Sequence, residues 1–237
     1  MRVQELWRYP VKSLQGERLH QALVTAHGLD GDRRYAIFDV GTGLGLTARR
    51  MPQLLFASAS LTAGGSVRIT LPDGSAADGD DALSDWLGRR VALRSAGQAS
   101  GRRYEDVVDF EREQTSPWRA FEGASGPFHD SGRARVSLVS TQTIGGWDRR
   151  RFRPNVLLDG AGEDALTGSS VSLGEAVLDI GGKIQRCVMV TRPQPGGIDR
   201  DLDVLRTIAR ERAVCLAVGA MVARAGIVRD GDELRRA

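Results

Sequence analysis

The sequence is poor in aromatic residues, and its two signs of charge are nearly balanced. Aromatic side chains make up 5% of the 237 residues, and 33 basic residues face 30 acidic ones. Proteins that bind nucleic acid usually carry a basic stripe interleaved with aromatic side chains, so nucleic acid is not an expected partner. The composition is compatible with small anionic ligands instead.

Cysteines and long apolar segments are also scarce. Two cysteines, Cys187 and Cys215, are too few for a disulfide framework. The longest uncharged apolar run, residues 214–223, is too short to cross a bilayer, and the N-terminus has no pattern typical of an export signal. These features predict a cytoplasmic protein in a reducing compartment, without a membrane partner.

Lysine is the rarest basic residue. Only Lys12 and Lys183 are lysines, which leaves 31 arginines among the 33 basic residues. A single arginine is therefore weak information here, whereas a retained lysine indicates a position that needs a compact, flexible ammonium. Lys12 and Ser13 follow Pro10, which ends a predicted strand, and we expect them on a loop at a domain edge. An ordinary exposed turn also fits this position.

Short segments rich in β-branched and aromatic residues predict a mainly β protein. The expected strands cover residues 3–9, 21–27, 34–40, 54–61, 67–71, 135–139, 156–158, 171–180, 184–190 and 216–222. Helical spacing appears only over 81–87, ending at Gly88, and over 202–209. The polar, Gly- and Ser-rich stretch 95–130 is typical of a linker or a mobile excursion, so we place a domain boundary near residue 100.

Three features suggest a function at first sight, but the residues alone do not support it. The stretch 41–45 is rich in glycine but lacks the spacing of a nucleotide loop, and it predicts a hairpin turn. The three histidines are scattered without metal-ligand spacing, so zinc is not expected. Four arginines crowd residues 149–153 and could direct several guanidinium groups at one phosphate or carboxylate, although a solvated charged turn explains that spacing better.

Cys187 is the strongest single candidate for chemistry. It follows Arg186 directly and Lys183 by four residues, at the end of a strand-like run. Nearby cations favour the thiolate, which is the form of cysteine that binds soft metals or attacks electrophiles. An inert buried cysteine is the commoner case, and Cys215, set among apolar residues, fits that description much better. Composition and spacing thus indicate an anion-binding pocket of unknown chemistry.

Several short motifs, taken together and in order, carry a resemblance to a known family. They are Tyr9-Pro-Val-Lys-Ser13, Gly31-Asp-Arg33, Thr47-Ala-Arg49, Phe128-His-Asp130, Ser140-Thr-Gln-Thr143, Arg151-Phe-Arg-Pro-Asn155 and Arg186-Cys187. The ordered set resembles the MOSC superfamily, which includes the mitochondrial amidoxime-reducing components, their bacterial relatives and the C-terminal domain of molybdenum cofactor sulfurases. The resemblance implies a mainly β, α+β fold with few helices: an N-terminal β-barrel domain, residues 1–100, followed by a MOSC β-barrel domain, residues 101–237.

The resemblance also implies a site. Cys187 matches the cysteine whose thiolate ligates molybdenum in such relatives, and it is therefore the expected metal ligand and catalytic residue of a molybdenum–molybdopterin cofactor. Eight further residues match positions that hold the pterin and its phosphate: Lys12, Ser13, Arg33, Ser140, Thr143, Arg153, Asn155 and Arg186. Pyridoxal phosphate is not expected, because the desulfurase domain that uses it in the sulfurases is absent.

The function implied is that of a reductase of small N-hydroxylated or N-oxygenated substrates. The chain ends without the four-cysteine ferredoxin-like tail of some relatives, so we expect a separate ferredoxin- or flavin-type electron donor. Arg192-Pro193-Gln194 stands where amidoxime-reducing relatives show Val-Asp-Pro, and Met221 where they show an aromatic residue, which leaves the substrate open. Two alternatives remain: a carrier of sulfur or of the cofactor without turnover of its own, and a barrel that serves only as an interaction surface.

Overall fold

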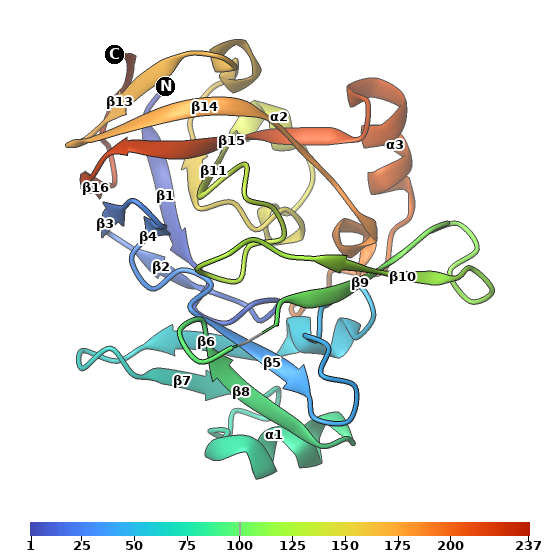
Figure 1. The fold of residues 1–237 in the computed structure, drawn as a ribbon. Coiled ribbons are helices and arrows are strands. Elements are labelled where there is room, and N and C mark those ends of the chain that lie inside the picture. The colour runs from blue at the N-terminus through green and yellow to red at the C-terminus, as the bar shows by residue number, and fades with distance from the viewer. Residues whose placement is uncertain (100) are drawn as a thin grey trace.

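The computed structural model describes residues 1–99 and 101–237, and most of this chain forms strands (Figure 1). The described residues contain three α-helices: α1 (Gly79–Leu87), α2 (Thr141–Ile144) and α3 (Asp203–Arg212). They also contain four 3₁₀ turns: η1 (Pro52–Phe56), η2 (Arg149–Arg151), η3 (Glu163–Leu166) and η4 (Val188–Thr191). The protein is therefore mainly β with few helices, as the sequence predicts. None of the helices in the described part of the chain has the length and apolar character needed to span a bilayer.

A curled sheet of eight strands forms the upper half of the molecule in Figure 1. Its strands are β1 (Val3–Arg8), β2 (Glu17–Leu19), β11 (Val136–Ser140), β12 (Val156–Leu158), β13 (Ser170–Leu173), β14 (Ala176–Gln185), β15 (Cys215–Arg224) and β17 (Leu234–Arg236). The spatial order is β17-β13-β14-β15-β11-β12-β1-β2, in which β11 and β12 are parallel and the other neighbours antiparallel. Alternate side chains of these strands, among them Leu138 and Leu178, meet in one apolar core.

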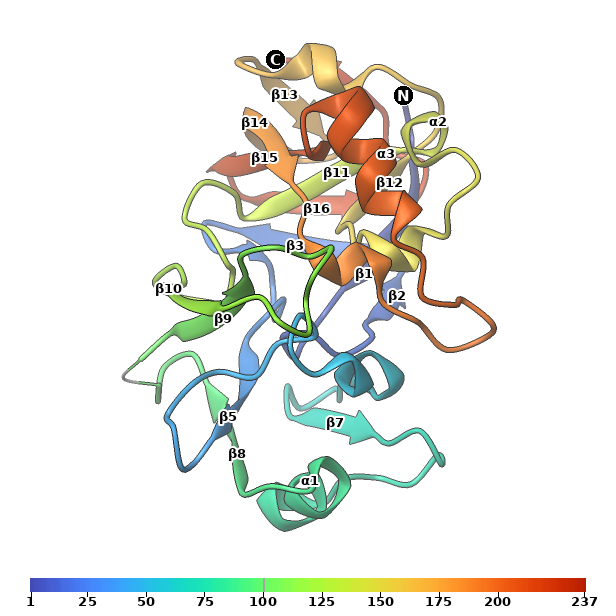
Figure 2. The ribbon, with the colours of Figure 1, turned by 90° about the vertical axis from the view of Figure 1, so that its right-hand side faces the viewer.

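Smaller sheets complete the fold, and those within residues 35–95 form the lower half, with α1 beneath them (Figure 2). Their strands are β3 (Gln21–Thr25), β4 (Gly28–Leu29), β5 (Tyr35–Asp39), β6 (Ser58–Leu61), β7 (Val67–Thr70), β8 (Val91–Ser95) and β16 (Gly226–Arg229). The pairs are β5 with β8, β6 with β7, and β3 with both β4 and β16. Val11, Leu54 and Leu83 lie in a second core.

Strands from both ends of the chain pair with each other. β1 lies beside β12, and β3 lies beside β16 near the C-terminus. N-terminal strands therefore complete the eight-stranded sheet, which comes mostly from the second half of the sequence, and a strand near the C-terminus completes the sheet of β3 and β4. The boundary near residue 100 stays a prediction.

The expected linker 95–130 contains a folded hairpin, so the prediction of a linker or mobile excursion is wrong for residues 103–122. Its strands are β9 (Arg103–Val107) and β10 (Trp118–Glu122), paired residue by residue. Tyr104 is fully buried, packs against Phe121 and shares an apolar cluster with Phe128. Burying aromatic rings contributes more than the local Gly and Ser content opposes, which is why composition misled here.

Two predicted strands are partly wrong. Residues 52–56 form η1, which begins at Pro52, and only Ser58–Leu61 is a strand. The segment 184–190 leaves β14 at Gln185 and turns into η4, so Cys187 caps a 3₁₀ turn instead of ending a strand. Both segments contain enough apolar residues to suggest a strand, but a 3₁₀ turn buries Leu54 and Leu55 in the first and Val188 and Val190 in the second. The predicted helices are confirmed as α1 and α3, and Gly88 ends α1 in the left-handed conformation.

Candidate functional site

A cavity of about 710 Å³ lies where the two halves of the molecule meet. Its walls come from the loops around Lys12, Arg33 and Arg49, from residues 129–137, and from the segment that joins β14 to η4. Seven of the nine predicted site residues line it: Lys12, Ser13, Arg33, Arg153, Asn155, Arg186 and Cys187. The structure therefore brings together residues that lie up to 175 positions apart in the sequence.

Cys187 is half-buried in this wall, in extended backbone directly after β14. The neighbouring Arg186 is held rigidly, because its Nε donates to the carbonyl of Leu216 at 2.8 Å and its Nη1 to the carbonyl of Phe152 at 3.1 Å. Burial lowers the pKa of Arg186 to about 10, so the guanidinium still carries its charge at neutral pH. A fixed cation therefore lies next to the thiol.

Arg33 and Arg153 lie over the ring of Tyr9. Their guanidinium carbons are 5.1 and 4.2 Å from the ring centroid, within the range of cation–π attraction. Tyr9 is buried and donates its hydroxyl to the carbonyl of Pro154 at 3.1 Å, and burial raises its pKa to about 12. A neutral aromatic ring thus supports two arginines at the cavity. Burial also lowers the pKa of Arg153 to about 10, which leaves it charged.

Three cavity residues have left-handed backbone although none is glycine. The φ angles are 71° at Ser13, 51° at Arg33 and 51° at Arg153. A side chain in this conformation costs on the order of 1 kcal/mol or more, and such strain concentrates at functional sites. Among the described non-glycine residues only three others share it: Ala213, Val214 and Ala217.

Asp130 forms ion pairs with two cations of the cavity. It contacts the ammonium of Lys12, and its Oδ2 accepts from Nη2 of Arg49 at 2.6 Å. Lys12 is buried, donates also to the carbonyl of Phe128 at 2.9 Å and lies 4.3 Å from the ring centroid of Tyr104. Burial by itself would raise the pKa of Asp130, but the charges of Arg49 and Lys12 outweigh it and hold that pKa below its ordinary value.

Arg49, His129 and Asp130 were not among the predicted site residues. The signal was present, because all three lie in the motifs that carry the family resemblance. Burial lowers the pKa of His129 to about 3, with the charge of Arg33 as a further cause, so the imidazole is neutral at physiological pH.

Five buried nitrogen atoms of residues that line the cavity have no hydrogen-bond partner among the described residues. They are Nε of Arg49, Nη1 of Arg135, Nη1 of Arg153, Nη2 of Arg186 and Nε2 of His129. Buried polar groups are almost always paired, and one that is not costs about 1–3 kcal/mol. Donors of this kind in one cavity can pair with an acceptor from outside the chain, either water or a ligand.

Two predicted cofactor residues do not line the cavity. Ser140 and Thr143 belong to the start of α2, where the hydroxyl of Ser140 accepts from the backbone N–H of Thr143 at 3.3 Å. The N–H of Ser140 donates to Glu163 at 3.1 Å. The Ser-x-x-Thr spacing is thus explained by helix capping. Asn155 does reach the cavity wall, but its side-chain oxygen accepts from Ser137, and its amide donates to the carbonyl of Trp7 at 3.2 Å.

The arginines of 149–153 point to different places. Arg149 pairs with Glu5 at 2.6 Å, and Arg150 with Asp148 at 2.8 Å. Arg151 is buried and donates to the carbonyls of residues 190, 192 and 199, which fixes η4 and the loop after it. Only Arg153 lines the cavity. The local crowding therefore has separate structural causes.

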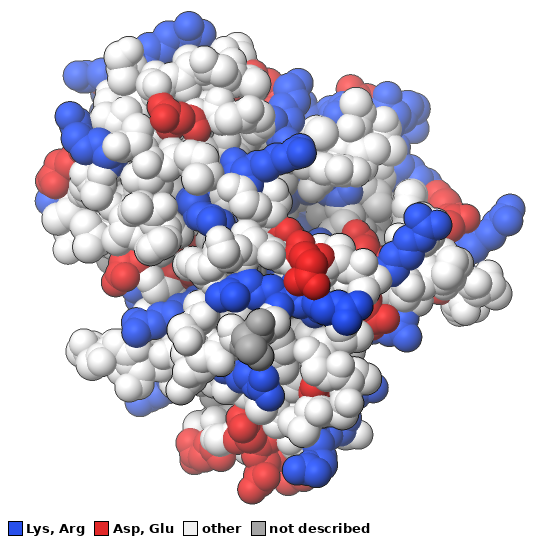
Figure 3. All heavy atoms as spheres, viewed as in Figure 1, with Lys and Arg blue, Asp and Glu red and all other residues white. Residues whose placement is uncertain are grey.

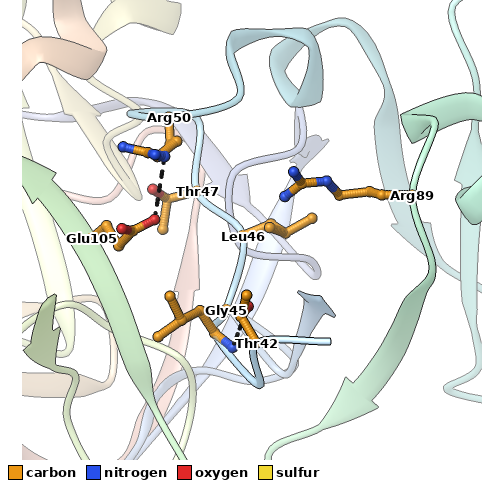
Figure 4. A pocket seen from close by; sticks show the side chains of 8 residues that line it. Thr42, Gly45, Leu46, Thr47, Arg50, Arg89 and Glu105 are labelled. Atoms are coloured by element: carbon orange, nitrogen blue, oxygen red, sulfur yellow. Dashed lines mark hydrogen bonds and ion pairs between the residues drawn. The ribbon is translucent and has the colours of Figure 1, made fainter. Parts of the chain in front are cut away.

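A second hollow, of about 200 Å³, lies in the N-terminal half (Figure 4). Its two cationic side chains are both paired with carboxylates. Arg50 lies 3.3 Å from Glu105, and Arg89 lies 3.2 Å from Asp39. One wall is the glycine-rich stretch 41–45, which is a turn closed by a bridge between Phe38 and Gly45, as predicted. Because both cations are paired, this hollow offers no free charged group to bind a ligand.

The face of the molecule in Figure 3 carries charges of both signs. A row of basic side chains crosses its middle, and acidic side chains lie next to this row and at the bottom. Within residues 1–99 and 101–237, no three His, Cys, Asp or Glu side chains are placed to hold a metal ion together. A metal in the cavity would therefore need ligands from a cofactor in addition to Cys187.

Comparison with known proteins gives the following matches. The model of the MOSC N-terminal beta barrel domain matches residues 1–110, and that of the MOSC domain matches residues 126–235. The molybdenum cofactor sulfurase of Drosophila grimshawi is 26% identical over 250 aligned positions, which cover 91% of this chain and 31% of that protein. The chain thus spans about a third of that relative.

Two solved structures are more distant. The YUAD protein from Bacillus subtilis is 12% identical, with a TM-score of 0.45, covering 98% of this chain and 93% of that one. YiiM from Geobacillus stearothermophilus is 16% identical, with a TM-score of 0.37, covering 50% and 67%.

Proposed function

The chain belongs to the MOSC superfamily, and from this and the cavity we propose that it binds a molybdenum–molybdopterin cofactor and reduces N-oxygenated small molecules. The observation that carries the proposal is the pairing of one half-buried thiol, Cys187, with buried guanidinium donors of Arg153 and Arg186 that lack an acceptor in the described chain. A thiolate suits a soft or high-valent metal, and forked donors suit a phosphate.

The residues present fit such a cofactor. Arg153 and Arg186 have no carboxylate partner in the described chain, and a phosphate group carries nearly two negative charges at neutral pH. Arg33 and Arg153, held on the ring of Tyr9, would grip the phosphate and the pterin. Cys187 would ligate the metal, with Arg186 stabilising the thiolate. Ser13 and Lys12 would close the wall from the N-terminal half.

When bound, the cofactor supplies two-electron chemistry: the N–O bond of the substrate breaks, two electrons and two protons enter, and the products are the reduced nitrogen compound and water. The electrons would come from a separate ferredoxin- or flavin-type protein. The chain's own residues bind the cofactor, fix its orientation and keep the thiol beside a permanent cation.

The test compares wild type, C187A and C215A, grown with molybdate. Cys215 is the matched control because it is also half-buried but does not line the cavity. We expect molybdenum and releasable pterin in wild type and C215A, and little of either in C187A. Both loaded proteins should reduce benzamidoxime with an artificial electron donor. A fully loaded wild type that reduces no N-hydroxylated compound would refute the reductase, and unchanged metal content in C187A would refute the site.

A second candidate, a carrier of sulfur or cofactor, is favoured by the similarity to a protein named molybdenum cofactor sulfurase. Under this function Cys187 would carry a persulfide or pass the cofactor to an apo-enzyme. Intact-mass measurement of wild type and C187A after treatment with a sulfur donor separates the two functions. An adduct of one sulfur atom on wild type alone would favour the carrier.

A further inference from the structure

The cavity carries more positive charge than the phosphate of the proposed cofactor would compensate. Eight cationic side chains line it, and the one carboxylate among the lining residues is Asp130. Lys12 and Arg49 share Asp130, Arg33 contacts Asp32, and Lys183 lies 3.1 Å from Asp164. Four cations therefore have no carboxylate partner among the described residues: Arg133, Arg135, Arg153 and Arg186.

These four divide into two groups. Arg153 and Arg186 belong to the set that would hold the cofactor, whose phosphate compensates about two charges. Arg133 and Arg135 lie on the separate wall segment between Asp130 and β11. No carboxylate of the described residues pairs with this second pair, and the phosphate of the proposed cofactor is already matched by the first.

Arg135 and His129 both present unsatisfied groups at this wall. One nitrogen of Arg135, Nη2, donates to the carbonyl of Ser125 at 3.3 Å, which fixes the guanidinium, while Nη1 is buried without an acceptor. His129 is only 9% exposed, and its Nε2 is buried and equally unpartnered. A neutral imidazole with its proton on Nε2 is a donor. A fixed guanidinium and a neutral N–H donor are the groups that bind a carboxylate or phosphate.

We propose that Arg135 and His129 form a subsite for the carboxylate or phosphate group of the substrate, so that the enzyme acts on anionic N-oxygenated compounds. This inference rests on the proposed function. Arg135 supplies the charge, His129 adds a second donor, and Arg133 raises the local positive potential at the exposed edge of the same wall. The reacting N–O group would then lie toward Cys187.

The test measures kcat/KM for 4-carboxybenzamidoxime relative to benzamidoxime in wild type, R135Q and R68Q. Arg68 is an exposed residue of β7 outside the cavity, so R68Q changes the net charge equally. We expect wild type and R68Q to prefer the carboxylated substrate, and R135Q to lose roughly tenfold of that preference through KM. Equal preference in R135Q and R68Q would overturn the subsite. H129L, which removes a donor without changing the charge at neutral pH, should lower the preference as well.

A binding measurement keeps this inference separate from the reductase function. Inorganic phosphate is titrated calorimetrically into each full-length protein, and the pterin content is measured in the same samples. We expect R135Q to lose one class of phosphate binding that R68Q retains, with pterin content unchanged. This result would support the subsite even if no amidoxime is reduced. Loss of pterin in R135Q would instead assign Arg135 to the cofactor's phosphate and refute a substrate site.

Discussion

Replacing Asp130 by asparagine should lower the unfolding free energy of the protein and increase its affinity for anions. Asp130 is the carboxylate shared by Lys12 and Arg49, both of which are buried. Breaking a buried ion pair costs about 3–5 kcal/mol, but the Asp130 side chain is 43% exposed and solvent screens it. We therefore expect D130N to lose about 1–3 kcal/mol of unfolding free energy when no ligand is bound.

The same substitution frees two cations for an external anion. In the wild type, an anion that enters the cavity competes with Asp130 for Lys12 and Arg49. Without this competition, phosphate should bind D130N about tenfold more tightly, which corresponds to about 1.4 kcal/mol. Phosphate should then raise the melting temperature of D130N more than that of wild type, because a ligand stabilises the folded state in proportion to its affinity.

The pH dependence gives the sign of the effect independently. The pKa of Asp130 lies below its ordinary value of 3.8, so its stabilising contribution is present above that value and is lost as the pH falls through the lower, folded pKa. The gap in unfolding free energy between wild type and D130N should be constant from about pH 8 to pH 5 and narrow below about pH 4.

Chemical denaturation across this range, with and without phosphate, tests both effects. D85N is the control, since Asp85 is an exposed residue of α1 outside the cavity. Should D130N match wild type in stability at pH 7, or gain no affinity for phosphate, the role assigned to Asp130 would be wrong.

Two further substitutions test the packing that supports the cavity. A Cβ on Gly123 would lie 2.4 Å from the buried Tyr104 ring, so G123A should lower the unfolding free energy by about 1–3 kcal/mol. G64A, in an open turn, is the control and should change the unfolding free energy little. Thermal melts of the two variants measure the difference. R151K should lower the unfolding free energy by about 1–3 kcal/mol, because lysine cannot reach all three carbonyls that Arg151 contacts. The segment after Cys187 should then show faster hydrogen exchange. R210K, on the exposed side of α3, is the control and should match wild type.

Local sequence patterns predict much of the fold. Of the site, they predict only the residues that belong to recognisable motifs. β1, β3 and β5 could be predicted from short runs rich in β-branched and aromatic residues, and α3 has a strong apolar face. The hairpin β9–β10 was missed because its stability comes from Tyr104, whose buried contacts lie elsewhere in the chain. Burial of this kind is a tertiary property that a polar, glycine-rich stretch does not reveal.

The site shows the same limit. Cys187, Arg153 and Arg186 could be predicted because a motif places them, but the function of a neighbouring arginine depends on which carboxylate it meets. Arg149 and Arg150 directly precede the motif and are paired with Glu5 of β1 and with Asp148 at the start of η2. Arg135 lies outside every motif, and only the absence of a partner in the folded chain distinguishes it.

Backbone strain and unpaired buried nitrogen atoms occur together in this cavity. Ser13, Arg33 and Arg153 hold left-handed backbone, at a cost on the order of 1 kcal/mol or more each. Each buried nitrogen without a partner costs about 1–3 kcal/mol more, while a whole protein is stable by only about 5–15 kcal/mol. Core packing could not favour such an arrangement for its own sake. An anionic ligand that accepts from these donors would offset the part of this cost that comes from the unpaired nitrogens, so a bound anion should raise the unfolding free energy of the protein.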